Sequence, residues 1–215
     1  MRAEKYQTMS KVLYPLYSMV HPIDGFQEMK YNRKDSLPVA ILILLIWFFS
    51  SVIGWKYTDF DFNVFRADRL NILLVLAKTI LLFVLLAISN WAFCTLMDGK
   101  GKFREICIYG AYAALPHILI SLIRIVFSRV LTLEEGVLLS YLRVIGLIWT
   151  GVLLITAFVV LHEYTIKKAV YSMLLSVLGV LIILFLLLLV YTLIQQLIYF
   201  IFGIGYEIMY KFTGD

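Results

Sequence analysis

Long apolar runs, separated by short polar segments, fill most of the chain. A helix needs roughly 20 apolar residues to cross a hydrocarbon layer ~30 Å thick. The runs that meet this length are Leu37–Trp55, Ile72–Met97, Ile106–Val130, Val137–Leu161 and Ala169–Thr192. None of them shows the period-two alternation of a transmembrane β-strand. The pattern therefore predicts an all-α polytopic membrane protein with five transmembrane helices, which form a membrane domain over residues 37–193.

The last apolar run does not end where a span should end. From Ala169 to Tyr210 the chain has few helix breakers, and one helix over this length would measure about 60 Å, twice the hydrocarbon thickness. We therefore expect a bend near Gln195-Gln196. Residues 194–215 then form either an amphipathic helix on the membrane surface or a short re-entrant segment that turns at Gly203 and Gly205.

Residues 1–36 form an amphipathic N-terminal segment that Pro15 and Pro22 divide into short helices. Its apolar face is predicted to comprise Leu13, Leu16, Val20, Ile23, Phe26 and Met29. Lys30, Arg33 and Lys34 follow just before the first span. This segment either docks on an anionic inner leaflet or provides an ordinary positively charged flank.

The distribution of lysine and arginine predicts the orientation of the chain. Outside the spans, eleven of these residues fall on the side of the N-terminus and five on the other side. The positive-inside rule then places the N-terminus in the cytoplasm, and an odd number of spans places the C-terminus outside. We expect a multi-pass protein of the cell (plasma) membrane.

Composition narrows the classes of function. Of the 215 residues 62% are apolar and 15% are charged, and the mean hydropathy is +0.92. A soluble enzyme, a disordered chain and a nucleic-acid-binding protein are thereby excluded. Motifs of hydrolases, zinc peptidases and nucleotide-binding loops are absent, and the two cysteines have no metal-site spacing. We expect no catalytic residues, metal or cofactor.

Three cations interrupt the apolar runs at a similar depth, roughly 9–10 Å from the outer end of their spans. They are Lys78, Arg124 and Arg143. Because intramembrane charge is costly, they can form a positive cavity for an anion, a lipid headgroup or an acidic group of a partner. Alternatively, their long side chains reach the outer interface, or they pair with acids of the outer loops, namely Asp59, Asp61, Asp68, Glu134 and Glu135.

A proline in the third span predicts a kink with polar neighbours. Pro116 frees the carbonyl of Tyr112, and His117 beside it can donate to a freed carbonyl or to a neighbouring span. Ser89 and Asn90 in the second span lie at a nearby level. The histidine is either a proton-sensitive element or a hydrogen-bonded packing residue.

The loop between the second and third spans carries a basic patch. It reads Asp98-Gly99-Lys100-Gly101-Lys102-Phe103-Arg104-Glu105, and its glycines favour a tight turn. On the predicted cytoplasmic face, Lys100, Lys102 and Arg104 are candidate partner-binding residues.

A family resemblance rests on this loop and its surroundings. The motifs are Asn90-Trp91, the Asp98–Phe103 stretch, Gly110-Ala111-Tyr112-Ala113-Ala114-Leu115-Pro116, and His21-Pro22 through Gly25-Phe26 and Lys30. Over about residues 20–190 the chain resembles the Yip-domain family (Ypt/Rab-interacting membrane proteins), in particular its bacterial branch. The resemblance implies a five-span fold with a cytoplasmic N-terminus and no catalytic residues. The long hydrophilic N-terminal region of the eukaryotic adaptors, which bind small GTPases, is missing.

Three functions follow as expectations. The first is a non-enzymatic membrane adaptor or scaffold that acts by association, as a homo-oligomer or in a hetero-complex within the lipid. The alternative is an accessory or permease-like subunit of a solute transporter, such as a carbohydrate transporter of the ABC type, with a pathway at Lys78, Arg124, Arg143 and His117. A transport role predicts that Arg124 and Arg143 share a cavity. A third reading is lipid handling, in which the cations contact headgroups.

Overall fold

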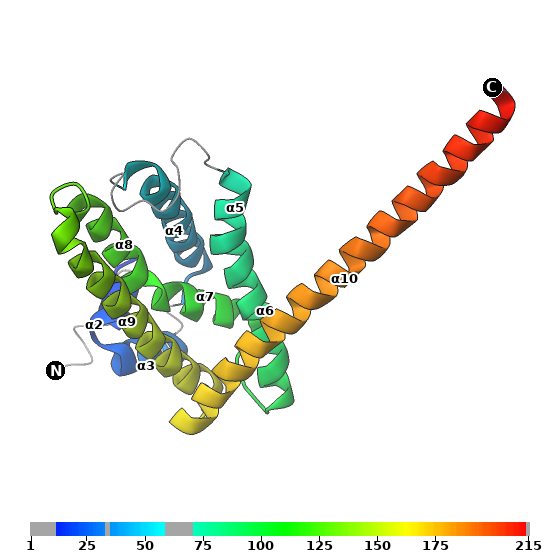
Figure 1. Ribbon diagram of the computed structural model, residues 1–215. Coiled ribbons are helices and arrows are strands. Elements are labelled where there is room, and N and C mark those ends of the chain that lie inside the picture. Colours follow the sequence, from blue (N-terminus) through cyan, green and yellow to red (C-terminus); the bar gives the residue numbers. More distant parts are fainter. Residues whose placement is uncertain (1–11, 33–34, 59–70, 214–215) are drawn as a thin grey trace, which may run out of the picture.

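Helices account for nearly all of the computed structural model, which describes residues 12–32, 35–58 and 71–213, and those ranges contain no strand (Figure 1). The elements are α2 (Tyr14–Val20), α3 (Pro22–Tyr31), α4 (Leu37–Tyr57), α5 (Ile72–Leu76), the π-helical η2 (Ala77–Leu81), α6 (Leu82–Leu96), α7 (Phe103–Ala113), α8 (Leu115–Phe127), the 3₁₀ turn η3 (Leu133–Glu135), α9 (Gly136–His162) and α10 (Ile166–Thr213).

Five stretches of the described chain are long and apolar enough to cross a membrane, as the sequence predicted. They are Leu37–Tyr57, Ile72–Leu96, Phe103–Phe127, Gly136–His162 and Ile166–Phe212. The second runs through α5, η2 and α6 without a break in the chain path. The protein is therefore an all-α polytopic membrane protein.

The third span bends where the proline predicts it. α7 ends at Ala113 and α8 begins at Leu115, with Pro116 in the first turn of α8. Because Pro116 has no N–H to donate to Tyr112, the helix is interrupted, and α7 and α8 run in different directions (Figure 1). The kink confirms the prediction.

α7 lies at the centre of the bundle. In an 18-residue apolar window of its span 61% of the residues are buried, whereas the share in the other four spans is 17–28%. Small side chains make this possible: Ala111 and Ala113 are fully buried, so α4, α6 and α9 can approach closely. Tyr109 and Tyr112, also buried, fill the space on either side.

The N-terminal segment forms two short helices, as predicted, and they pack on the bundle. Phe26 and Met29 are fully buried, and the Phe26 ring stacks on Tyr109 with 5.6 Å between centroids. At the turn between the helices, Trp149 Nε1 of α9 donates to the Met19 carbonyl over 3.3 Å. The predicted single apolar face is therefore divided: its last two residues face the protein, while Leu13, Leu16, Val20 and Ile23 remain exposed.

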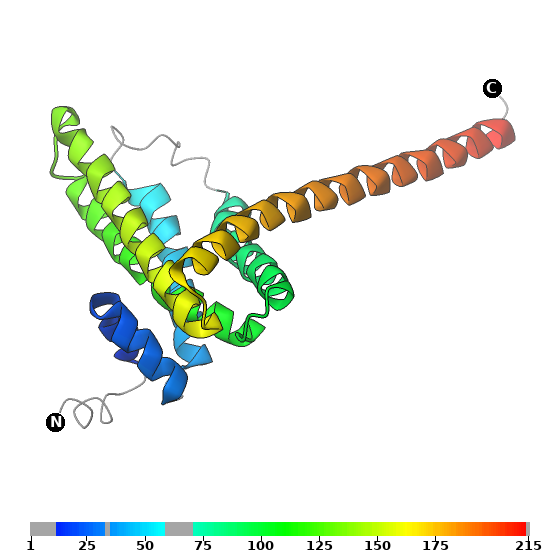
Figure 2. The same cartoon turned by 90° about the horizontal axis from the view of Figure 1, so that it is seen from below.

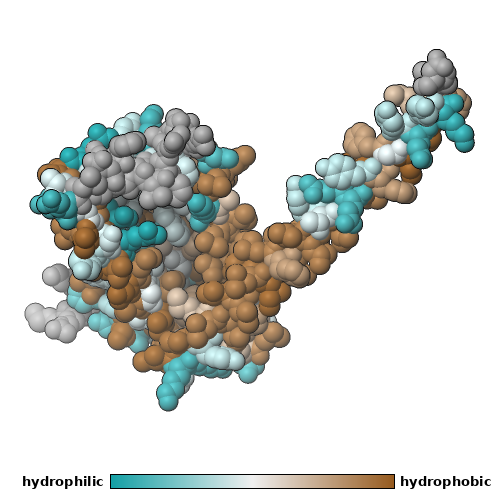
Figure 3. Space-filling view, in the orientation of Figure 1, coloured by the Kyte–Doolittle hydropathy of each residue, from teal (hydrophilic) through white to brown (hydrophobic). Residues whose placement is uncertain are grey.

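α10 is one helix of 48 residues. Its first part packs against α6, where Ser89 Oγ donates to the Ser176 carbonyl over 2.7 Å and Asn90 Nδ2 donates to Ser176 Oγ over 2.9 Å. From Leu181 onward almost every residue is exposed, and the helix stands clear of the bundle in both views (Figures 1 and 2). Its surface is apolar where it leaves the bundle and more polar toward the free end (Figure 3).

The bend expected at Gln195-Gln196 is wrong, because α10 continues through it. Gln195 Nε2 donates to Tyr191 Oη over 2.7 Å, one turn earlier on the same helix. The polar side chain is thus partly satisfied without leaving the helical path, and the stretch from Val180 to Phe202 has no proline or glycine to break it. Whether residues 194–215 act as a separate interfacial segment stays a prediction.

Candidate functional site

One end of the bundle, here called the basic end, is formed by the loop 98–102, the turn 163–165 and the C-terminus of α3. The helices α6 and α9 both finish there in the same way. Asp98 and Glu163 adopt left-handed backbone conformations with φ of 59° and 57°. The next N–H, of Gly99 or Tyr164, returns to the helix, to the Cys94 carbonyl over 2.7 Å and the Val159 carbonyl over 3.1 Å. These are Schellman caps, and they place the two loops against each other.

The two glycines of the loop are needed for this close approach. A Cβ on Gly99 would lie 2.6 Å from His162 Nδ1 and from Tyr164 Oη, and a Cβ on Gly101 would lie 2.8 Å from Leu161 Cγ. The Gly101 N–H instead donates to His162 Nδ1 over 3.3 Å. The glycines were predicted for a tight turn, and the structure adds contact with the end of α9 as a second requirement.

Tyr164 and Lys168 bind the end of α6 from the other side. Tyr164 Oη lies 3.2 Å from the carbonyl oxygens of both Cys94 and Met97. Lys168 Nζ donates to the Met97 carbonyl over 2.7 Å and sits 4.4 Å from the centroid of the Tyr164 ring. Burial raises the pKa of Tyr164 to about 12, so the hydroxyl keeps its proton and remains a donor.

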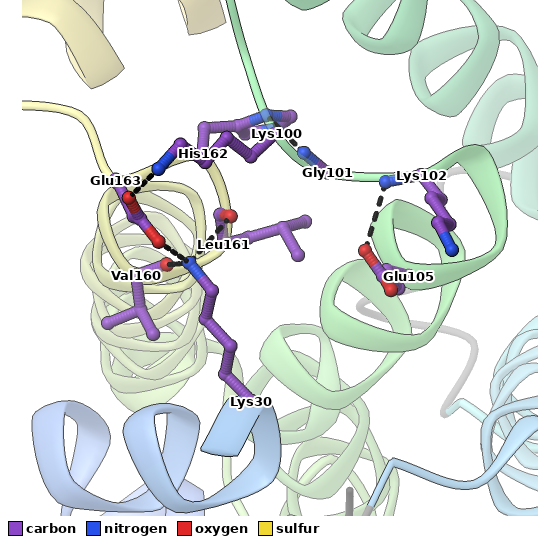
Figure 4. A network of polar contacts seen from close by, with 9 residues as sticks. All are labelled: Lys30, Lys100, Gly101, Lys102, Glu105, Val160, Leu161, His162 and Glu163. Atoms are coloured by element: carbon purple, nitrogen blue, oxygen red, sulfur yellow. Dashed lines mark hydrogen bonds and ion pairs between the residues drawn. The ribbon is translucent and has the colours of Figure 1, made fainter.

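Glu163 joins the loop to the N-terminal helices (Figure 4). Its carboxylate accepts from Lys30 Nζ over 2.9 Å and, through its other oxygen, from Lys100 Nζ. Hydrogen bonds from Lys100 and Lys30 lower the pKa of Glu163 to about 2. Lys30 also donates to the carbonyls of Val160 and Leu161 over 2.8 and 3.2 Å, which caps the C-terminus of α9.

A hollow of about 620 Å³, the basic hollow, opens beside this junction. It is lined by Met29, Lys30, Asp35, Lys100, Lys102, Arg104, Glu105, Tyr109 and Leu161. The three predicted partner-binding residues therefore lie together. Glu105 shapes the same loop, because its carboxylate accepts from the Lys102 backbone N–H over 3.0 Å.

Sequence reasoning missed Lys30 as a member of this surface, and missed Glu163 altogether. The sequence did contain a signal for Glu163. The charge count placed the loop 98–102 and the turn 163–165 on the same side of the membrane, so the acid at the end of the fourth span could have been paired with the basic loop.

A second hollow, the arginine hollow, lies between α4, α8 and α9 near the opposite end of the bundle, with a volume of about 290 Å³. Its lining includes Trp47, Ser50, Ser51, Trp55, His117, Ser121, Arg124, Ser128 and Arg143. Arg124 Nε donates to the Leu139 carbonyl over 3.0 Å, and the His117 ring meets Trp47 edge-on with 6.0 Å between centroids. Arg124, Arg143 and His117 thus share one hollow.

The structure places Lys78 and Asn90 elsewhere. Both line an apolar cavity of about 230 Å³ that lies among α4, α6, α7, α9 and α10. Lys78 Nζ is 5.9 Å from the Trp55 ring centroid. Asn90 binds Ser176 of α10, so it and Ser89 do not serve His117 as suggested, and the five predicted polar residues do not form one cluster.

Ion pairs with outer acids do not account for the arginines within the described part of the chain. Its ion pairs are the two that Glu163 makes at the basic end. Glu135 accepts instead from the Thr132 backbone N–H over 3.1 Å. The predicted partners Asp59, Asp61 and Asp68 lie outside the described residues, as do the basic residues Arg33 and Lys34 of the N-terminal flank.

Among the residues that the structure describes, no group of three or more His, Cys, Asp or Glu side chains could hold a metal ion.

The comparisons with known proteins agree with the resemblance noted in the sequence. The family model of the Yip1 domain matches residues 16–189, which is most of the chain. No curated protein and no solved structure gave a match. The chain, a multi-pass helical protein with a kinked and buried third span, therefore belongs to the Yip1 domain family.

Proposed function

We propose that this protein is a non-enzymatic membrane adaptor that binds an acidic segment of a partner protein in the basic hollow. The observation that carries the proposal is the convergence of Lys30, Lys100, Lys102 and Arg104 on one hollow, although they come from segments about 70 residues apart. Membership of the Yip1 domain family supports a membrane-associated role.

Charge and shape favour an acidic peptide. Four basic and two acidic side chains line the basic hollow, so it carries a positive excess. Met29, Tyr109 and Leu161 border the hollow but are buried, so the charged side chains provide most of the surface that a partner can contact. Charged rims of this kind guide an oppositely charged partner and fix its register. By the orientation predicted from the charge count, this surface faces the cytoplasm.

The loop 98–102 and the lysines beside the hollow are suited to recognition because several contacts fix their positions. Lys30 and Lys100 are fixed by Glu163, and the loop backbone is fixed by His162 and Glu105. A surface that is ordered before binding loses less conformational entropy when the partner arrives. Lys102 and Arg104 make no ion pair with the described residues, so their charges are available.

The test is affinity purification from native membranes in a mild detergent, read by mass spectrometry. The wild type is compared with a triple variant, Lys100→Ala with Lys102→Ala and Arg104→Ala, and with Lys102→Ala plus Arg104→Ala, which keeps the Lys100–Glu163 pair. We expect a stoichiometric partner with the wild type and its loss from both variants.

Lys167→Ala provides the matched control, because Lys167 is exposed at the same end but outside the basic hollow. It should retain the partner. Equal recovery of every partner by the wild type and the double variant would refute the proposed surface, provided that both elute as folded protein.

A second candidate is an accessory subunit of a solute transporter. Its supporting observation is that Arg124 and Arg143 line one hollow, which is the arrangement expected for a transport role. The corresponding test is Arg143→Leu in cells, with uptake and complex assembly measured together. Loss of uptake with intact assembly supports this role, and unchanged uptake argues against it.

A further inference from the structure

We propose that the arginine hollow binds a phosphate group, supplied either by a phospholipid headgroup or by a soluble phosphate. This inference concerns the end of the bundle opposite to the adaptor surface. The inference rests on the same hollow as the proposed transporter role. Because phosphate binding is measured without measuring uptake, a failure of the binding inference can be told from a failure of the transporter role.

The hydrogen-bonding character of the lining selects an acceptor as ligand. The serine hydroxyls are already committed as donors: Ser50 and Ser51 donate to the Trp47 carbonyl over 2.8 and 2.9 Å, and Ser121 donates to the Ile118 carbonyl over 2.7 Å. Each side chain thus bonds to its own helix. The charged donors of the lining belong to the two arginines, and the imidazole of His117 and the indole N–H of Trp47 add neutral donors.

Arg124 keeps most of its donors after its contact with the protein. Its Nε–H is used by the Leu139 carbonyl, and the four remaining guanidinium N–H groups are left for other acceptors. Arg143 is exposed and makes no ion pair with the described residues. A planar guanidinium presents paired N–H groups that match two oxygens of a phosphate, which explains why arginine suits this ligand better than a point charge.

Electrostatics favour a bound anion. Two positive charges in one hollow repel each other, and the repulsion is strengthened where apolar side chains lower the local dielectric. Trp47 and Trp55 provide such walls here. A phosphate between the guanidinium groups turns this repulsion into two attractive contacts.

The depth of the two arginines fits a headgroup. Arg124 lies three residues before the end of α8 at Phe127, and Arg143 lies seven residues after the start of α9 at Gly136. At 1.5 Å per residue these positions are about 5 and 10 Å from the helix ends, a depth from which the long side chain of an arginine can reach the headgroup layer.

The experiment measures binding to the purified full chain in detergent, in two arms. In the first, native mass spectrometry compares retention of dioleoylphosphatidylglycerol with that of dioleoylglycerol, which lacks the phosphate. In the second, the melting temperature of delipidated protein is measured in sodium phosphate and in sodium chloride at equal ionic strength. R143Q is the main variant, because Arg143 is exposed and its loss leaves the packing unchanged; R124Q is the second.

We expect the wild type to retain the phosphatidyl lipid in preference to the diacylglycerol, and R143Q to weaken this retention by about tenfold, as for the loss of one charge-assisted contact. K56Q is the matched control. It removes an exposed lysine in the last turn of α4, near the arginine hollow but outside its lining, and it should behave as the wild type. Stabilisation by phosphate without lipid retention, again lost in R143Q, assigns the site to a soluble phosphate. Equal behaviour of the wild type, R143Q and R124Q in both arms overturns the inference.

Discussion

At the scale of single residues, Glu163 has the widest structural role at the basic end. Its carboxylate contacts lysines that precede it by 133 and 63 residues, in α3 and in the loop after α6. It also occupies the left-handed cap position of α9, with φ of 57°. One side chain therefore connects three segments, and the arrangement of the basic hollow depends on it.

The stability that Glu163 contributes should depend on pH. Because its pKa is depressed to about 2 in the folded protein, the contribution is fully present above the ordinary carboxylate pKa of roughly 4.3 and is lost as the pH falls through about 2. We expect Glu163→Gln to lower the melting temperature in detergent slightly at pH 6, since the carboxylate is 45% exposed and screened. The difference from the wild type should shrink between pH 5 and pH 3; a constant difference would show that another group is responsible.

Gly99→Ala and Gly101→Ala should both destabilise the protein. Each added methyl would meet atoms of the α9 end at 2.6–2.8 Å, and overpacking of this kind costs about 1–3 kcal/mol. Thermal unfolding in detergent measures the effect. Gly203→Ala is the matched control, because its Cβ meets nothing within 4 Å and alanine favours the helix. If this variant lowered the melting temperature as much as the other two, the packing argument would be wrong.

Local chemistry explains which site residues could be predicted. Lys100, Lys102 and Arg104 are near neighbours in sequence, so their shared surface follows from the chain itself. Asn90 and Ser176 are 86 residues apart, and no sequence pattern distinguishes a serine that accepts from asparagine from one that faces lipid. Contacts between distant helices need the packing, which depends on all side chains at once.

At the scale of elements, prolines gave reliable predictions. Pro15 and Pro22 divide the N-terminal segment into α2 and α3, and Pro116 divides the third span, because a proline removes one backbone donor wherever the helix lies. The bend expected at Gln195-Gln196 had no such local cause. It was inferred from membrane thickness, and the helix has no breaker at that point. The π-helical turn at Ala77–Leu81 had no recognised signal either.

The continuity of α10 can be measured by electron paramagnetic resonance. With the native cysteines replaced by alanine, spin labels at Leu181→Cys and Tyr206→Cys on one unbroken helix should lie about 38 Å apart at 1.5 Å per residue. Both positions are exposed, so labels are tolerated. A markedly shorter distance in lipid nanodiscs would mean that the helix bends after all; a pair at Val170→Cys and Leu181→Cys, before the bend position, serves as the reference.

At the scale of the whole molecule, composition and run length were enough to predict five spans, because the need to shield apolar side chains from water acts on every residue of a run. The relative placement of the spans was not accessible in this way. Apolar helices in lipid are arranged by small side chains and polar contacts, such as Ala111 of α7 and Ser176 of α10. Ala111 belongs to a recognisable motif, but nothing in the sequence singles out Ser176 for this role.

The predicted orientation is open to a direct test by cysteine labelling. In a background without native cysteines, Lys167→Cys at the basic end should react with a membrane-impermeant maleimide only after permeabilisation, because basic loops are retained in the cytoplasm. Glu134→Cys at the opposite end should react in intact cells. Both residues are exposed. The reverse pattern would place the basic hollow outside and exclude a cytoplasmic partner.

The way Glu163 closes the basic end has a consequence for biosynthesis. The ribosome makes the loop lysine 63 residues before the glutamate that fixes it, so the early spans enter the membrane with this surface still open. Only when α9 has been inserted does the carboxylate reach Lys30 and Lys100. A chain that stalls before that point exposes Lys30 and Lys100 without the carboxylate that fixes their positions. Binding of a partner at this surface would thus distinguish a chain whose fourth span is in place from one that ends before it.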